Sequence, residues 1–187
     1  MRALIVDGYN VVHAWPSLKR LLQSSGLEDA RTQLVRLLAE YAAQTGTSVT
    51  VVYDSHGRTG ATQTDEIDGV TVLFGSRTAS ADHVIERLAY EAARRGDAAD
   101  VVVATSDRLQ RAIVSAVGAA TMSALALEAE VARVLAETDE TSRRIGRTGH
   151  AARRVEDRLS PDVRARLDAL RRGIVEDTTG PEEPAAP

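Results

Sequence analysis

Short apolar runs alternate with longer segments of helical periodicity over the first 137 residues. Uninterrupted apolar runs without polar alternation predict strands buried on both faces, as in a parallel sheet. These strands are expected at residues 3–6, 49–53, 70–74 and 101–104, with a short fifth strand within 118–122.

Helices are expected between and after these strands, because apolar residues recur there at helical spacing. The predicted helices cover residues 17–23, 27–44, 81–95, about 107–117 and 123–136. Ser80 is a suitable N-cap, and Gly46 a suitable C-terminal stop. Residues 55–68 are polar and contain glycine, which favours a long loop. Alternating strands and helices predict an α/β fold with a doubly wound parallel sheet and helices on both faces.

The chain is expected to have one principal domain over residues 1–137, because no repeat or linker divides it. An arginine-rich helical extension follows at 138–175, with a helix starting at Ser160-Pro161. The acidic and proline-containing tail at 176–187 is predicted to be disordered.

Composition narrows the class of protein. Hydrophobic residues make up 43% and charged residues 27%, which is ordinary for a globular protein. No apolar run approaches the roughly 20 residues of a membrane span, and no signal-peptide pattern follows the N-terminus. The absence of cysteine excludes disulfides and thiolate chemistry. A cytoplasmic protein without a membrane partner is expected.

The formal net charge of -4 does not by itself indicate a nucleic-acid partner. However, basic residues crowd one stretch, and nearly all are arginine, with Lys19 the single lysine. Arginine grips phosphate with two parallel hydrogen bonds, although a GC-rich genome also favours it. The stretch contains Arg143, Arg144, Arg147, Arg153, Arg154 and Arg158.

Acidic residues follow several predicted strands. Asp7 and Asp54 come directly after strands, Asp107 follows Thr105-Ser106, and Asp82 opens a predicted helix. The carboxyl ends of parallel strands meet at one edge of the sheet, where ligands bind. Grouped carboxylates repel one another unless a cation neutralises them, and such oxygen ligands suit Mg²⁺ or Mn²⁺. Each acid taken alone also fits a helix cap or a surface charge.

Other chemistries of this sheet edge lack their motifs. No G-x-G-x-x-G follows the first strand, and no P-loop is present. A receiver domain would need an early acid pair and a late lysine. A haloacid-dehalogenase-type phosphatase would need an acid two residues after Asp7, where Tyr9 stands.

Several side chains near the predicted edge are candidates for RNA contact, each with a plain surface or packing role as its alternative. Arg108 and Arg111 lie three residues apart on one predicted helix and can face the same way. Glu86 is a candidate outer ligand or a surface residue. The other candidates are Tyr9, for base stacking, with His56 and Arg77.

Five segments resemble the YacP-like branch of the NYN-domain proteins, which are PIN-like ribonucleases. They are VDGYN at Val6–Asn10, YDSH at Tyr53–His56, SAD at Ser80–Asp82, ATSD at Ala104–Asp107 and RVEDRLSPDVRARLDALRRG at Arg154–Gly173. The resemblance runs in order over about residues 3–173. It implies a Rossmann-like PIN/NYN fold with a C-terminal helical extension.

The resemblance also implies roles for individual residues. Asp7, Asp82 and Asp107 would hold or order a Mg²⁺ or Mn²⁺ ion. Asn10 would orient the first acid or a phosphate, Ser106 would buttress the site, and Asp54 would have a less defined part. The implied activity is metal-dependent endoribonuclease cleavage of mRNA in association with the ribosome.

Three other hypotheses remain. The chain is alternatively a non-catalytic RNA- or ribosome-binding module, or a partner-binding protein that acts through its arginine-rich part. A small-molecule phosphatase is the third. Metal-dependent turnover of RNA separates the nuclease from all three.

Overall fold

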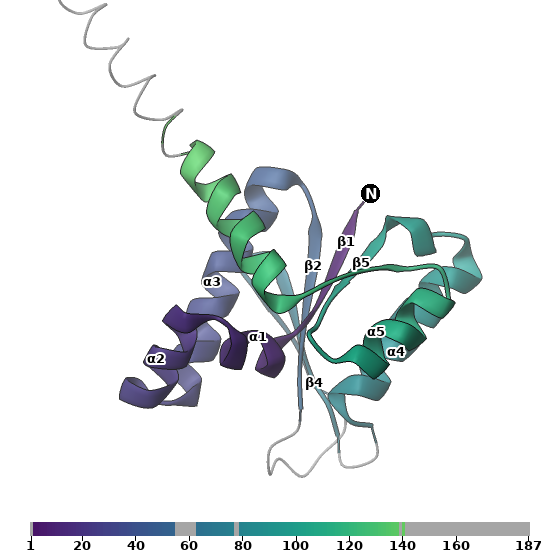
Figure 1. Cartoon of the computed structure of the whole chain (residues 1–187), viewed down its shortest axis with the longest axis horizontal. Coiled ribbons are helices and arrows are strands. Elements are labelled where there is room, and N and C mark those ends of the chain that lie inside the picture. The colour runs from purple at the N-terminus through teal and green to yellow at the C-terminus, as the bar shows by residue number, and fades with distance from the viewer. Residues whose placement is uncertain (1, 55–62, 77–78, 139, 141–187) are drawn as a thin grey trace, which may run out of the picture. The chain divides into compact units, whose positions relative to one another are not determined.

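Residues 2–54, 63–76, 79–138 and 140 of the 187-residue chain are described by the computed structural model (Figure 1). The chain divides into two units, Met1–Asp139 and Glu140–Pro187. The predicted helix at Ser160-Pro161 and the predicted disordered tail lie outside the described residues. Within those residues, no helix is long and apolar enough to cross a membrane.

A sheet forms the centre of the first unit, and it has six strands within the described residues. Its strands are β1 (Ala3–Asp7), β2 (Ser48–Tyr53), β3 (Gln63–Ile67), β4 (Val70–Phe74), β5 (Val101–Ala104) and β6 (Ala120–Met122). Their order is β3-β4-β2-β1-β5-β6, so β1 lies in the middle. All neighbours pair in parallel except β3 and β4. The carboxyl ends of β4, β2, β1, β5 and β6 therefore share one edge.

Helices cover both faces of the sheet (Figure 1). They are α1 (Gly8–Ala14), α2 (Pro16–Ser25), α3 (Leu27–Thr45), α4 (Ala81–Arg95), α5 (Arg108–Ala116) and a last helix at 124–138, with a 3₁₀ turn, η1, at Ala98–Asp100. Side chains alternate along β1. Leu4 and Val6 join the core under α1, α2, α3 and the last helix, whereas Ile5 joins the core under α4 and α5. Burial on both faces explains the continuous apolar runs.

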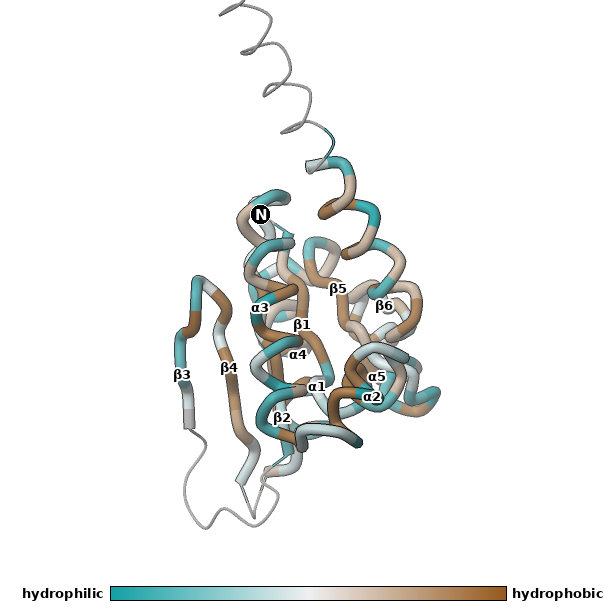
Figure 2. The backbone as a smooth tube through the Cα atoms, turned by 90° about the vertical axis from the view of Figure 1, so that its left-hand side faces the viewer, coloured by the Kyte–Doolittle hydropathy of each residue, from teal (hydrophilic) through white to brown (hydrophobic). Residues whose placement is uncertain are grey.

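Hydropathy follows this layering (Figure 2). The strand β4 is largely apolar, whereas its neighbour β3 at the edge is largely polar. The edge strand β3 pairs with one neighbour, β4, and has less apolar surface to bury than a central strand. Charged side chains such as Asp65 and Glu66 are therefore tolerated there.

Trp15 joins the first two helices to the last one. It ends α1, precedes Pro16 at the first position of α2, and is 2% exposed. Its indole Nε1 donates a hydrogen bond to the carbonyl oxygen of Ala124 at 2.7 Å. The chain segment after β1 is thereby anchored to the start of the last helix, 109 residues further on.

The predicted fold class is confirmed: a mostly parallel central sheet is flanked by helices on both faces. Element bounds agree closely as well. The helix predicted at 81–95 is α4, and those at 27–44 and 17–23 are α3 and α2 with slightly wider limits. The short strand predicted within 118–122 is β6.

Two segments differ from expectation. The loop predicted over 55–68 was wrong at its end, because residues 63–67 form β3, antiparallel to β4. Asp68 and Gly69 both have positive φ, 51° and 79°, and this Asp-Gly pair is a strong signal for a tight hairpin. In addition, α1 directly follows Asp7, as the capping alternative for that residue requires.

Gly8 is needed where β1 passes into α1. A Cβ atom at this position would lie 2.3 Å from Cε1 of Tyr53, whose ring is 1% exposed. We expect Gly8→Ala to lower the free energy of unfolding by about 1–3 kcal/mol through overpacking, despite the better helix propensity of alanine. Denaturant unfolding of the wild type and variant measures this change.

The Tyr53→Leu background provides the control for this prediction. If the Tyr53 ring causes the clash, Gly8→Ala costs less stability in that background, and the two substitutions are non-additive. Equal destabilisation in both backgrounds would contradict the steric explanation.

Candidate active site

A pocket of about 400 Å³ opens at the carboxyl edge of the sheet, beside the end of β1. It contains three of the four acids that the sequence places at this edge; the fourth, Asp107, precedes α5. The lining residues are Asp7, Tyr9, Asn10, His13, Asp54, Ser80, Ala81 and Asp82.

Asp7 ends β1 and caps α1. Its Oδ1 accepts a hydrogen bond from the Asn10 backbone N–H at 3.1 Å, and its Oδ2 accepts a longer one from the Thr105 hydroxyl at 3.4 Å. Both carboxylate oxygens are therefore tied to the protein. The side chain is held at the end of the central strand instead of moving freely in solvent.

Asp107 is held in the same way at the start of α5. Its Oδ1 accepts hydrogen bonds from the backbone N–H groups of Leu109 at 2.7 Å and Gln110 at 3.1 Å, which caps α5. Its own N–H donates to Oγ1 of Thr105 at 3.1 Å. The fully buried Thr105 hydroxyl thus links Asp7 to Asp107.

Asn10 and Ser106 connect the first helix to the loop after β5. Oδ1 of Asn10 accepts a hydrogen bond from the Ser106 N–H at 2.8 Å. Oγ of Ser106 accepts one from the Ala124 N–H at 3.3 Å, at the start of the last helix. The backbone of Asn10 contacts Asp7, while its side chain fixes the segment that carries Asp107.

Asp82 reaches the site from α4. Ser80 caps this helix, since its Oγ accepts a hydrogen bond from the His83 N–H at 3.5 Å. The Ser80 Oγ and Nδ1 of His83 are also 2.9 Å apart, so His83 belongs to this cap. Oδ1 of Asp82 accepts a 2.7 Å hydrogen bond from Nε2 of Gln110.

Burial and two neighbouring acids, Asp82 and Asp107, change the electrostatics of Asp7. Burial raises the pKa of Asp7 above its ordinary value of 3.8, and the hydrogen bond from Asn10 opposes this. The negative charges of Asp82 and Asp107 raise the pKa further. Carboxylates from three distant parts of the chain therefore share one local field.

The donor set suits a hydrated hard cation. Among the residues that the structure describes, no group of three His, Cys, Asp or Glu side chains is arranged to bind one metal ion directly. Mg²⁺ keeps several waters and uses one or two carboxylates, so it does not need such a group. Asp7 and Asp82, which line the same pocket, fit this mode, with Asp107 near enough to act through charge.

An aromatic cluster supports the pocket. The ring of Tyr9 meets that of Tyr53 edge to face, with 5.3 Å between centroids, and Tyr53 stacks on Phe74 at 5.7 Å. The guanidinium of Arg31 lies 5.1 Å from the Tyr9 ring centroid and bonds Glu28 at 3.2 Å. Tyr9 is thus both a pocket-lining residue and part of this packing, and its predicted base contact remains a prediction.

The other predicted RNA-contact residues are placed only in part. Arg108 is exposed in the first turn of α5, and Arg111 is half-buried one turn later. Glu86 is half-buried on α4, while its neighbour Arg87 pairs with Glu91 at 3.8 Å. His56, Arg77, Arg143, Arg144 and Arg147 lie outside the described residues.

Sequence reasoning missed three residues of this edge. Thr105 and Gln110 are buried polar residues that hold the acids, but their sequence context shows only an ordinary strand end and helix start. His13 lines the pocket, three residues after Asn10 on the same helix. That spacing, which places both on one face of α1, was the available signal.

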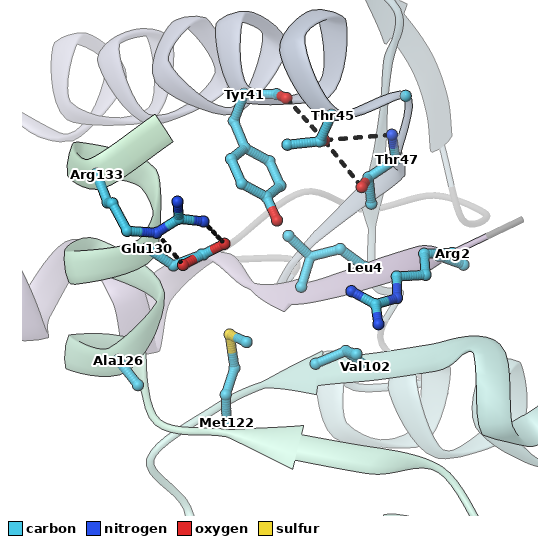
Figure 3. A pocket seen from close by; sticks show the side chains of 12 residues that line it. Arg2, Leu4, Tyr41, Thr45, Thr47, Val102, Met122, Ala126, Glu130 and Arg133 are labelled. Carbon is cyan, nitrogen blue, oxygen red and sulfur yellow. Dashed lines mark hydrogen bonds and ion pairs between the residues drawn. The ribbon is translucent and has the colours of Figure 1, made fainter. Parts of the chain in front are cut away.

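A larger cavity, of about 690 Å³, lies at the opposite end of β1 (Figure 3). Tyr41 and Met122 point into it from opposite sides. The guanidinium of Arg133, which lines this cavity, forms ion pairs with the carboxylates of Glu130 and Glu137, each at an N–O distance of 2.8 Å. The rest of the lining combines aliphatic side chains with the polar residues Arg2, Tyr41, Thr45 and Thr47. It carries one carboxylate, Glu130, so the grouped carboxylates are at the smaller pocket.

The raised pKa of Asp7 has a consequence for stability. The folded protein binds this proton more tightly than the unfolded chain does, so the stabilisation is present below pH 3.8 and is lost as the pH rises through the folded pKa. Asparagine keeps a cap but carries no charge. In chelator, we expect Asp7→Asn to be more stable than wild type at pH 7, and this advantage to vanish near pH 3.5.

Denaturant midpoints at the two pH values measure this difference. Asp29→Asn, at an exposed acid of α3, is the matched control and is expected to leave the difference between the pH values unchanged. A variant at position 7 that is less stable than wild type at pH 7 would show that the cap of the charged side chain outweighs its burial.

Comparison with known proteins agrees with this arrangement. A family model, the YacP-like NYN domain, matches residues 4–172. YacP of Bacillus subtilis strain 168 is 35% identical over 173 residues, which are 92% of this chain and 98% of that protein.

Two crystal structures of Rae1 (YacP) from Bacillus subtilis are also similar to this chain. One has a TM-score of 0.64 at 35% identity and covers 92% of this chain and 96% of its own. The other, of a mutant, has a TM-score of 0.66 at 32% identity and covers 91% and 99%. The chain therefore belongs to the YacP-like NYN domain family, within the PIN-like nuclease superfamily.

Proposed function

We propose that this protein is a divalent-metal-dependent endoribonuclease that hydrolyses RNA phosphodiester bonds at the acidic edge of its sheet. Family membership supports an RNase-type function with RNA as the substrate. The observation that carries the finer proposal is the convergence of Asp7, Asp82 and Asp107. Asp7 and Asp82 line one pocket, and the pKa of Asp7 is raised first by burial and then by the charges of Asp82 and Asp107.

Asp7 and Asp82 would hold a Mg²⁺ or Mn²⁺ ion, and Asp107 would order its hydration shell. Such an ion supplies a reactive water at neutral pH and stabilises the leaving oxygen of a phosphodiester. The protein itself orients the carboxylates that would hold the ion. Thr105 and the N–H of Asn10 orient Asp7, and Gln110 orients Asp82.

RNA would approach over the first turn of α5. Arg108 is exposed directly after Asp107 and can bind a phosphate beside the acids. Arg143, Arg144 and Arg147 belong to the arginine-rich stretch, whose many cations favour a polyanion through counterion release. The resemblance to YacP-like ribonucleases supports mRNA on the ribosome as the substrate.

A non-catalytic RNA-binding module is the second candidate. It is favoured by one observation: no described group of three metal-binding side chains is arranged around a common point. Such a module would bind RNA equally well with and without a divalent ion. Turnover, and not affinity, separates the two functions.

Removing one acid tests catalysis. We expect Asp7→Asn and Asp82→Asn to lower the rate of RNA cleavage by about 100-fold or more, because several kcal/mol of transition-state stabilisation depend on the ion. Labelled RNA is incubated with Mn²⁺, Mg²⁺ or chelator, and products are resolved by gel. Asp29→Asn is the control and should cleave like wild type. Full cleavage by Asp7→Asn in chelator would refute the metal-dependent mechanism.

Removing the C-terminal part tests where the activity resides. A chain that ends at Glu137 keeps every residue of the acidic edge named above. We expect it to retain metal-dependent cleavage of naked RNA and to lose affinity for ribosomes, measured by co-sedimentation. Complete loss of cleavage by a folded truncated protein would favour the hypothesis of a partner-binding protein that acts through its arginine-rich part.

A further inference from the structure

Gln110 is an unusual residue for its position. Of the residues that the structure describes, three polar side chains are buried: Ser76, Thr105 and Gln110. Gln110 is 3% exposed, although it lies in the first turn of a helix whose neighbouring side chains, Arg108 and Leu109, face solvent. Burial of an amide is unfavourable unless hydrogen bonds replace those with water.

Gln110 bonds two of the acids at once. Its side-chain Nε2 donates to Oδ1 of Asp82 at 2.7 Å, and its backbone N–H donates to Oδ1 of Asp107 at 3.1 Å. Asp82 opens α4 and Asp107 caps α5, and the core between these helices and the sheet is apolar. Apolar packing fixes distance but has little directional preference, whereas a hydrogen bond fixes the orientation of a carboxylate.

We propose that Gln110 is the positioning residue of the acidic site, and that its amide sets the orientation of Asp82 relative to Asp107. This inference rests on the proposed function, because it concerns the same acids. It adds a residue that touches neither the substrate nor the ion and acts through Asp82.

The neutral amide explains why glutamine suits this position. Arginine stands at positions 108 and 111, so the chain places cations nearby. A guanidinium at position 110 would form an ion pair with Asp82 and compete with a bound cation. An amide donates a hydrogen bond without cancelling the charge, and it uses Oδ1 of an exposed Asp82, which leaves Oδ2 for a ligand.

The other end of the amide argues against a purely stabilising role for Gln110. Its Oε1 atom is buried and has no hydrogen-bond partner among the described residues. An unpaired buried acceptor destabilises the folded state, and an apolar residue of the same shape would remove it. Asp82 is exposed, so water would replace the lost hydrogen bond on its side.

The Gln110→Met variant of the full chain separates the two roles. Methionine fills a similar volume but donates no hydrogen bond. We expect the Mn²⁺ affinity, measured by calorimetry, to fall about 10–100-fold, as is typical when the partner of a metal ligand is lost. The kcat for RNA should fall similarly with little change in KM, while the metal-free Tm stays equal or rises.

Two further variants complete the test. Val114→Ala removes buried apolar volume from α5 away from the acids, and it should lower the Tm but keep the Mn²⁺ affinity. If Gln110 acts through Asp82, then Gln110→Met adds little to the loss of Mn²⁺ affinity that Asp82→Asn already causes.

The outcomes distinguish this inference from the proposed function. Wild-type Mn²⁺ affinity and kcat in Gln110→Met would overturn the positioning role alone, and so would losses that merely follow a lowered Tm. Additive effects of Gln110→Met and Asp82→Asn would also overturn it. If the wild type neither binds Mn²⁺ nor cleaves RNA in its presence, the proposed function fails, and the positioning role fails with it.

Discussion

Repulsion among carboxylates at one sheet edge is the constraint that this structure must meet. Each of the three acids stands at the start of a helix: Asp7 caps α1, Asp107 caps α5, and Asp82 lies in the first turn of α4. A helix N-terminus presents unpaired N–H groups and the positive end of its dipole, so it stabilises negative charge. The helix N-termini therefore offset part of the repulsion among these acids.

The residues that cap these helices are consequently also residues of the candidate active site. Removing a cap typically costs a helix about 0.5–2 kcal/mol, so Asp7 and Asp107 contribute to folding as well as to the site. The hydrogen bonds that satisfy the helix also hold the carboxylate oxygens still. An active site needs such fixed groups, because reorganisation during the reaction would raise the barrier.

A second set of contacts, between aromatic rings, supports the start of α1, where Asp7 and Asn10 lie. Gly8 lets the ring of Tyr53 pack directly against the start of α1, and Tyr9 and Phe74 extend this packing. Arg31 lies against the same rings with a side chain that is 14% exposed. Rigid aromatic packing beneath Asp7 and Asn10 keeps the pocket wall from shifting when a charged ligand binds.

The sequence by itself determined the sheet apart from β3, the flanking helices apart from α1, and the edge at which the acids gather. Runs such as Leu4 to Val6 have no polar alternation because both faces are buried, and the first polar residue, Asp7, marks the strand end. The hairpin of β3 was also encoded, in Asp68-Gly69, but its polar strand hid it. A hydrophobic pattern in the sequence indicates which residues are buried, so it does not reveal an edge strand that buries few side chains.

Only the tertiary structure decided how the acids are held. Thr105 meets Asp7 from 98 residues away, Asn10 meets Ser106 from 96, and Gln110 meets Asp82 from 28. Such hydrogen bonds depend on strand register and on the rotation of each helix about its axis, which local sequence patterns do not specify. A hydrophobic stripe sets which face of a helix is buried, whereas a 2.7 Å contact requires every packed neighbour to be in place.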